Sequence, residues 1–140
     1  MRVAVDSNTI LSGLFFRGNE RRLLLAALRG AVTIVLAEDT VEEVNAVVQE
    51  TFRDHDDLPA ALDLLAAIVG SGEIVPREIY ASRLRRWVEK IRDESDAPLF
   101  ACADAVRADG VVSGDRDVLA MKGAEGLAVY RTREILDRLR

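Results

Sequence analysis

This sequence contains little histidine and cysteine, and it has no excess of positive charge. Its 140 residues include one histidine, His55, and one cysteine, Cys102, and its 24 acidic side chains outnumber 19 lysines and arginines. A single cysteine excludes an intrachain disulfide. The net charge of −5 argues against a surface that is basic throughout, as in plain nucleic-acid binders. Any nucleic acid would need local arginine and lysine patches or a bridging metal ion.

Long apolar runs, interdomain linkers and low-complexity segments are also missing. No segment reaches the roughly 18 apolar residues of a membrane span, and Asp6 comes too early for a signal peptide. Cys102 lies among alanine and leucine, which predicts a buried thiol and a reducing, cytoplasmic setting. His55 lies in a charged turn, where we expect it to face solvent. Hydrophobic residues make up 49% of the chain, so we expect one domain over residues 1–140, without membrane association.

Short apolar, often β-branched runs alternate with segments of helical periodicity along the chain. The predicted strands share an apolar run bounded by turn residues, and they cover 2–5, 31–36, 73–75, 110–113 and 127–130. The main predicted helices share a repeating apolar face, and they cover 38–52, 58–69, 82–91 and 97–108, with a last one from 132. This alternation predicts an α/β fold in which a mostly parallel sheet has helices on both faces.

Three aspartates lie at positions where an open α/β sheet forms its sites. Asp6 follows the first strand, Asp115 follows the 110–113 strand, and Asp96 opens the helix that leads into that strand. Sites of such sheets lie beyond the carboxyl ends of the strands, so the carboxylates converge if the two strands are neighbours. Because like charges at close range repel unless a cation intervenes, the cluster implies a divalent metal. Ligation by oxygen alone favours Mg²⁺ or Mn²⁺ over zinc.

Glu43 is the natural fourth acid of this cluster. A helical projection of 41–52 places Glu43 at the border of the apolar face, whereas Glu42 points more nearly to solvent. Thr40 and Glu43 also fit a capping box, which is a purely structural alternative.

The aspartates have structural alternatives as well. Asp6 and Asp96 can cap the helices that follow them, with Pro98 tolerated in the first turn, and Asp115 can be an ordinary turn residue. A capping carboxylate can still hold a metal with its free oxygen. The joint placement of the acids therefore carries the prediction, and no single acid does.

Four segments of the chain carry a family resemblance. They are Val-Asp-Ser-Asn-Thr-Ile-Leu-Ser-Gly-Leu at 5–14, the helix with Glu43, Arg-Asp-Glu-Ser-Asp-Ala-Pro at 92–98 and Ser-Gly-Asp-Arg-Asp at 113–117. In this order they resemble the PIN-domain family, and within it the VapC-like toxins of toxin–antitoxin systems. The resemblance covers essentially the whole chain. It implies a three-layer α/β/α fold and an endoribonuclease that depends on Mg²⁺ or Mn²⁺.

The resemblance also implies roles for individual residues. The family's four catalytic, metal-holding acids correspond to Asp6, Glu43, Asp96 and Asp115, a frequent fifth metal-binding acid corresponds to Asp117, and the small polar positions that support the acids correspond to Asn8 and Ser113. The fourth acid is either Glu43 or its neighbour Glu42, and Asp93 competes with Asp96. Independently of the resemblance, Arg116 and Lys122 follow the last acidic motif and are candidates for phosphate contact.

Partners and competing functions complete the predictions. The resemblance implies an RNA substrate, an antitoxin protein and a homodimer, and the leucine-rich segment 21–28 is read either as core or as a dimer face. The basic stretch 83–87 is read as a solvated helix face beside a tryptophan, with RNA contact as its alternative. A non-catalytic PIN scaffold that binds RNA or protein is the alternative function. A phosphatase of the haloacid-dehalogenase type is disfavoured, because it needs an aspartate where Asn8 stands.

Overall fold

The apolar runs of the sequence form one parallel sheet. In the computed structural model, which describes residues 1–140, the spatial order of the strands is β3-β2-β1-β4-β5, and every neighbouring pair is parallel. The strands are β1 (Arg2–Val5), β2 (Thr33–Ala37), β3 (Glu73–Val75), β4 (Gly110–Val112) and β5 (Val129–Tyr130). In the central strand, Val3 pairs with Ile34 on one side and with Gly110 on the other. The predicted α/β class and parallel sheet are confirmed.

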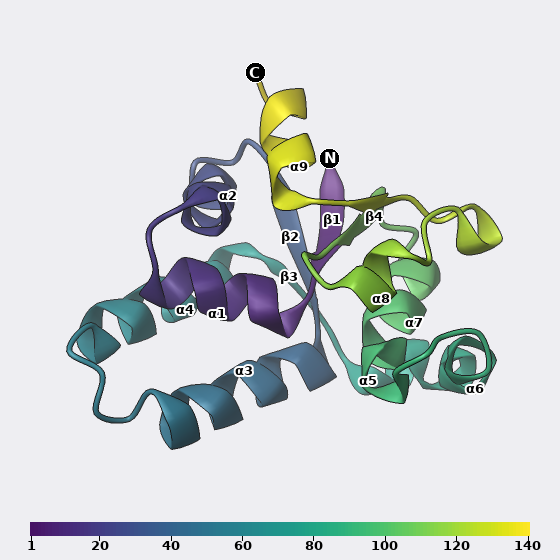
Figure 1. The fold of residues 1–140 in the computed structure, drawn as a ribbon, viewed down its shortest axis with the longest axis horizontal. Coiled ribbons are helices and arrows are strands. Elements are labelled where there is room, and N and C mark those ends of the chain that lie inside the picture. Colours follow the sequence, from purple (N-terminus) through teal and green to yellow (C-terminus); the bar gives the residue numbers. More distant parts are fainter.

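Helices cover both faces of the sheet (Figure 1). They are α1 (Ser7–Phe15), α2 (Asn19–Leu28), α3 (Glu38–Thr51), α4 (Leu58–Ser71), α5 (Arg77–Tyr80), α6 (Leu84–Val88), α7 (Ala97–Ala105), α8 (Arg116–Leu119) and α9 (Thr132–Arg138). Three short 3₁₀ turns cover Ala81–Arg83, Glu94–Asp96 and Ala124–Gly126. None of these helices combines the length and the apolar character needed to cross a membrane.

The alternation of side chains along the strands divides the interior into two cores. Val3 and Val5 of β1 pack in one core with apolar residues of α1, α2, α3, α4 and α9. Ala4, between them, packs in the other core with residues of α5, α6, α7 and α8. Successive side chains of a strand point to opposite faces, and strands buried on both faces are apolar throughout. The fold therefore has the three layers that the family resemblance implied.

Two of the predicted helices have different bounds in the structure. Of the helix predicted over 82–91, only α6 forms as an α-helix, and a 3₁₀ turn over Ala81–Arg83 joins it to α5. Tyr80 at the end of α5 and Trp87 on α6 are both fully buried in the same core. The helix predicted over 97–108 ends at Ala105, and Arg107 adopts a φ of 54°, a left-handed conformation that cannot continue a helix.

The prediction that His55 faces solvent is wrong. Its ring is half-buried and lies 5.1 Å from the ring of Phe15 and 5.8 Å from that of Phe52, measured between centroids. The imidazole Nδ1 also accepts a hydrogen bond from the backbone N–H of Asp57 at 3.0 Å. The charged residues next to His55 in sequence favoured a solvent-exposed position. The contacts with Phe15 and Phe52 form only when distant segments of the chain pack together.

The order of the strands determines where a site can form. The chain runs from β1 outward to β2 and β3, then returns to the other side of β1 for β4 and β5. Where the connections of a parallel sheet leave in opposite directions, a crevice opens beyond the carboxyl ends of the strands. In this fold the crevice lies next to β1 and β4, which are the strands followed by Asp6 and Asp115.

Candidate active site

Asp6 is fixed at the carboxyl end of β1 by three hydrogen bonds. Its backbone N–H donates to the carbonyl of Val112 on β4 at 3.3 Å, which ties the two strands together just below the site. Its Oδ1 accepts from the backbone N–H of Thr9 at 2.9 Å, so Asp6 caps α1. Its Oδ2 accepts from the hydroxyl of Ser113. The side chain is buried, and the capping role and a place in the site coexist.

Ser113 connects Asp6 with Asp115. Its fully buried hydroxyl donates to Asp6 and accepts from the backbone N–H of Asp115 at 2.9 Å. Asp115 is exposed and caps α8, because its Oδ1 accepts from the N–H of Asp117 at 2.7 Å. One hydroxyl thus sets the relative positions of two carboxylates from neighbouring strands, which is the supporting contact expected of this serine.

Asp96 lies across the crevice at the start of α7, and its carboxylate accepts no hydrogen bond from the protein. Asp93 caps the preceding 3₁₀ turn, Glu94–Asp96, because its Oδ1 accepts from the N–H of Ser95 at 3.0 Å and from the Ser95 hydroxyl at 2.8 Å, and no side chain caps α7. The pKa of Asp96 is raised to about 6, chiefly by burial and then by the negative charges of Asp93, Asp115 and Asp6, with a smaller contribution from Asp117. The predicted side-chain cap of α7 by Asp96 therefore does not form, and the Asp96 carboxylate has no hydrogen-bond partner in the protein.

Glu43 reaches the crevice from α3. Its Oε2 accepts a hydrogen bond from the hydroxyl of Ser7 at 2.9 Å. The adjacent Glu42 points away and pairs with Arg77 at 2.7 Å. The capping box of Thr40 and Glu43 does not form, because α3 begins at Glu38. Of the two candidate glutamates, the structure therefore places Glu43 beside the aspartates.

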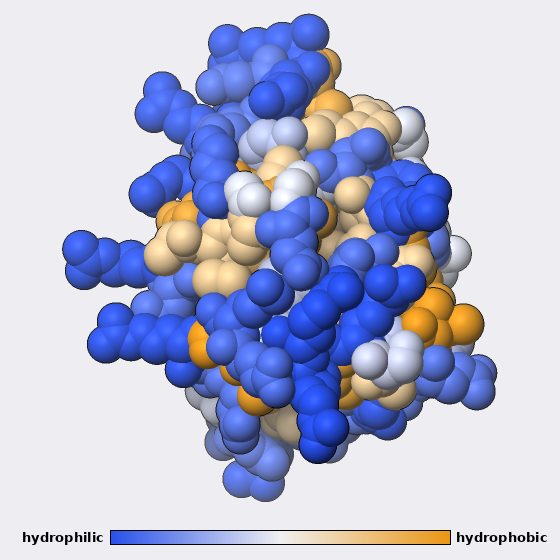
Figure 2. Space-filling view, turned by 90° about the vertical axis from the view of Figure 1, so that its right-hand side faces the viewer, coloured by the Kyte–Doolittle hydropathy of each residue, from blue (hydrophilic) through white to orange (hydrophobic).

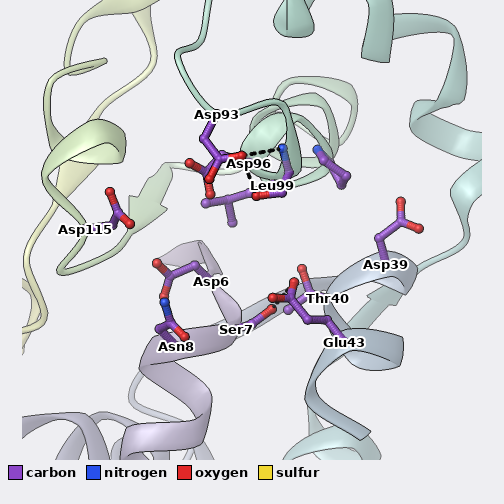
Figure 3. A pocket seen from close by; sticks show the side chains of 12 residues that line it. Asp6, Ser7, Asn8, Asp39, Thr40, Glu43, Asp93, Asp96, Leu99 and Asp115 are labelled. Atoms are coloured by element: carbon purple, nitrogen blue, oxygen red, sulfur yellow. Dashed lines mark hydrogen bonds between the residues drawn. The ribbon is translucent and has the colours of Figure 1, made fainter. Parts of the chain in front are cut away.

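These side chains line one cleft (Figure 3), in which Asp6, Asp96 and Asp115 approach from three different elements. The lining consists almost entirely of polar side chains, from Asp6, Ser7, Asn8, Asp39, Thr40, Glu43, Asp93, Ser95, Asp96, Pro98, Leu99 and Asp115. No lysine, arginine or histidine lines it. The cleft is therefore a concentration of negative charge with no cationic side chain in its lining.

The donor chemistry of the cleft fits a hydrated divalent cation. No group of three or more acidic, histidine or cysteine side chains is close enough to hold a metal ion directly. Mg²⁺, however, is usually bound through one or two carboxylates and keeps several of its waters. The all-oxygen lining and the uncompensated charge around Asp96 suit Mg²⁺ or Mn²⁺ and exclude a zinc site of histidine and cysteine.

The remaining residues predicted for the site lie at its margin or outside it. Asn8 lines the cleft from the start of α1. Asp117 does not line it, and its Oδ1 lies 3.9 Å from Nη1 of Arg92. Arg116 and Lys122 are exposed and also lie outside the lining. Of the residues predicted for the site, the four principal acids and Asn8 therefore line the cleft, and Ser113 supports it from below the surface through its contact with Asp6.

The basic stretch 83–87 lies outside the lining of the cleft. Arg83 and Arg86 pair with Asp104 on α7, and the indole N–H of the fully buried Trp87 donates to the same carboxylate at 3.1 Å. Figure 2 shows the side that carries α5 to α8 as mostly hydrophilic. Since two of the three arginines and the tryptophan have structural partners, the reading as a helix face is favoured over RNA contact.

Two residues of the cleft were not singled out by the sequence. Ser7 looks like an ordinary helix starter, and its bond to Glu43 depends on the packing of α1 against α3. Asp39 lines the cleft but is bound by Arg77 at 2.6 Å and by the Tyr80 hydroxyl at 2.7 Å. Although burial raises it, these bonds hold the pKa of Asp39 below its ordinary value. Asp39 is thus the one acid of the cleft whose charge is neutralised by a side chain of the protein, Arg77.

A three-layer parallel α/β fold with a carboxylate cleft beyond β1 and β4 defines the class of this protein. Residues 2–117 match the PIN domain family, so the chain belongs to that family. The resemblance seen in the sequence is confirmed. No protein of curated function is similar enough in sequence to match.

Two solved structures share the fold. One is PAE2754 from Pyrobaculum aerophilum, with a TM-score of 0.66 and 21% identity over 99% of this chain and 89% of that one. The other is VapBC2 from Rickettsia felis, bound to a DNA fragment from their promoter, with a TM-score of 0.65 and 17% identity over 94% of this chain and 98% of that one. At these identities the likeness concerns the fold.

Proposed function

We propose that this protein is a metal-dependent endoribonuclease and the toxin of a toxin–antitoxin pair. Membership of the PIN domain family and the fold shared with a VapBC complex support this proposal. The observation that carries it is the state of Asp96, a half-buried carboxylate with no hydrogen-bond donor, facing a cleft of further carboxylates. Such an arrangement costs stability in the metal-free protein, and a bound cation offsets that cost.

In this proposal Asp6, Glu43, Asp96 and Asp115 hold Mg²⁺ or Mn²⁺. The bound cation supplies a water of lowered pKa and stabilises negative charge on the scissile phosphate. The protein itself holds the carboxylates in place in the absence of the cation. Ser113 orients Asp6 and Asp115, and Ser7 orients Glu43.

The substrate and partners are proposed on the same basis. RNA is the substrate class that the PIN family resemblance implies, and Arg116 and Lys122 are proposed to contact its phosphates from the margin of the cleft. Asp117 is proposed as an additional acid near the metal, since its charge acts on Asp96. The fold shared with VapBC2 supports an antitoxin partner, and a homodimer remains part of the proposal.

The decisive experiment compares cleavage of a mixed RNA pool by the wild type, Asp6→Asn and Glu43→Gln, each in Mn²⁺, Mg²⁺ or EDTA. Glu42→Gln is the matched control, because it removes an equal charge from the next residue of α3 outside the cleft. We expect metal-dependent cleavage by the wild type and Glu42→Gln, and loss of cleavage in the two cleft variants.

The other outcomes separate the alternatives. Equal cleavage by all four proteins would indicate a contaminating ribonuclease and contradict the assignment. Absence of cleavage by the wild type, combined with Mn²⁺ binding that Asp6→Asn removes, would favour the non-catalytic scaffold. Cleavage that Glu42→Gln abolishes and Glu43→Gln spares would exchange the roles of the two glutamates.

A further inference from the structure

A second concave surface lies between α2 and α9, which are neighbours in the fold (Figure 1). Its floor is formed mainly by Leu25, Leu136 and Leu139, and arginines 22, 29 and 140 stand around it. We call this surface the α2–α9 groove. It adjoins the segment that leads into β2, so it lies at the amino-terminal edge of the sheet, whereas the acidic cleft lies at the carboxyl edge.

The leucines of α2 have two different environments. Leu23 and Leu24 are fully buried in the core, whereas Leu25 is 40% exposed and Leu28 is 38% exposed. Of the two readings of the 21–28 segment, the core reading holds for the first pair only. The second pair is left on the surface, and Leu25 lies in the groove. Exposed apolar side chains in a groove with a charged border are typical of an interaction site.

The charge of this region is opposite to that of the rest of the chain. Segments 17–31 and 131–140 contain eight arginines and three acidic side chains, a side-chain charge of +5 in a chain whose net charge is −5. None of these eight arginines forms an ion pair, although arginines 2, 77, 83, 86 and 92 all do. Arg21 is held by backbone carbonyls of α1 and Arg138 lies over the Tyr130 ring, but the three arginines that line the groove have no carboxylate partner beside the exposed leucines.

A second copy of this chain and an RNA strand both fit this surface poorly. A symmetric contact between two copies uses the same patch on each, so arginines would face arginines and repel. Single-stranded RNA is held by stacking of its bases on aromatic rings as well as by phosphate contacts, and no aromatic side chain lines the groove. An RNA would also leave the leucine floor without an apolar partner.

We propose that the α2–α9 groove binds an acidic, amphipathic segment of another protein. Apolar side chains of that segment cover Leu25, Leu136 and Leu139, and its carboxylates pair with Arg22, Arg29 and Arg140. An amphipathic helix that lays its apolar face in a groove is a common mode of peptide recognition. Guanidinium groups are suited to the carboxylates beside it.

A peptide-display selection against the wild-type protein in EDTA tests this proposal independently of any nuclease activity. Selected peptides are synthesised with a fluorescent label and titrated by anisotropy against the wild type, Arg22→Glu/Arg29→Glu and Leu25→Gln. Arg85→Glu is the control, because this exposed arginine on α6 has no ion-pair partner and lies on another face. Circular dichroism checks that each variant is folded.

We expect the selected peptides to combine Asp or Glu with Leu or Ile. Their affinity should fall at least about tenfold in the double arginine variant and in Leu25→Gln, and it should be unchanged in Arg85→Glu. The proposal is overturned if no selected peptide depends on these residues. It is also overturned if they instead control the binding of labelled oligouridylate, or a monomer–dimer equilibrium in sedimentation.

Discussion

The two ends of the strands carry surfaces with unpaired charges of opposite sign. The cleft at the carboxyl edge gathers carboxylates without a cation, and the α2–α9 groove at the amino edge gathers arginines without carboxylates. No buried side-chain nitrogen or oxygen in the molecule lacks a hydrogen-bond partner, so the unpaired charges lie at its surface. Unpaired charge of either sign contributes little to folding, so a concave surface that gathers charges of one sign is a candidate binding site.

The two regions also differ in how rigidly their side chains are held. Asp6 and Asp115 are fixed by the Ser113 hydroxyl and by helix caps, and Glu43 is fixed by Ser7. In the groove the only side-chain hydrogen bond is from Arg22 to Asn19, at 3.4 Å. A fixed arrangement suits chemistry on a small, defined group, whereas arginines with few hydrogen bonds around exposed leucines suit a surface that binds a peptide.

The largest effect in the cleft is expected from Asp96→Asn. It removes the one carboxylate that has no structural role, so metal-dependent RNA cleavage should fall at least about 100-fold. Asp93→Asn is the matched control, because its carboxylate caps the Glu94–Asp96 turn and its loss should reduce thermal stability more than cleavage. Initial rates in Mn²⁺ and a thermal melt of each variant provide the measurement.

The opposite pattern would exchange the two aspartates. If Asp93→Asn abolishes cleavage and Asp96→Asn retains it, Asp93 is the acid that matters. The absence of a donor at Asp96 would then reflect only its position at the start of α7.

Ser113→Ala should have the next largest effect. It removes the hydroxyl that links Asp6 to Asp115, so the affinity for Mn²⁺ should fall by about 10- to 100-fold. Isothermal titration with Mn²⁺ measures this change. Ser71→Ala, at the far end of α4, is a control that should leave the affinity unchanged. Unchanged affinity in Ser113→Ala would mean that the helix caps alone position the two carboxylates.

Much of the fold and the acidic cleft follows from local patterns in the sequence. The apolar runs predict the strands to within about two residues, and the strand order then brings Asp6 and Asp115 together. Asp96 and Glu43 are placed by helix periodicity and by the family resemblance. These features are predictable because each depends on only a few neighbouring residues and on the general rule for parallel sheets.

Other features depend on contacts that periodicity does not encode. The bond between Ser7 and Glu43 joins α1 to α3, and the His55 contact with aromatic rings joins three separate segments. The helix predicted over 82–91 is shortened to α6, and the burial of its Trp87 in one core with Tyr80 of α5 is likewise a contact between separate elements. The α2–α9 groove could not be predicted, because Arg22 and Arg29 are separated from Arg140 by 111 residues or more in sequence.

A smaller effect is expected on the stability of the metal-free protein. Since folding raises the pKa of Asp96 from an ordinary 3.8 to about 6, its ionisation disfavours the folded state. No cost arises below pH 3.8, the cost grows as the pH rises from 3.8 to 6, and it is complete above that range. A shift of this size is worth about 3 kcal/mol for a fully buried carboxyl, and solvent screening of a partly exposed one reduces it to about 1 kcal/mol.

Asp96→Asn should therefore stabilise the metal-free protein above pH 6, by about 2–4 °C in Tm. Thermal melts in EDTA across the acid to neutral range measure the difference, which should shrink as the pH falls. Added Mn²⁺ should reverse the order, because it stabilises the protein that binds it more tightly. A variant that is less stable than the wild type in EDTA at neutral pH would contradict the strain assigned to Asp96.

The smallest effect is expected on RNA cleavage when residues of the α2–α9 groove are substituted. Arg22→Glu/Arg29→Glu changes charge at the opposite edge of the sheet, and well-separated sites contribute almost independently. Cleavage of a short oligoribonucleotide should therefore stay within about twofold of the wild type at moderate salt, where screening limits long-range steering. Leu25→Gln, which keeps the charge and alters only the apolar floor, serves as the comparison. A larger loss in the double arginine variant alone, growing at low salt, would show that the arginines steer RNA toward the cleft, and the two edges would then form a single nucleic-acid-binding surface.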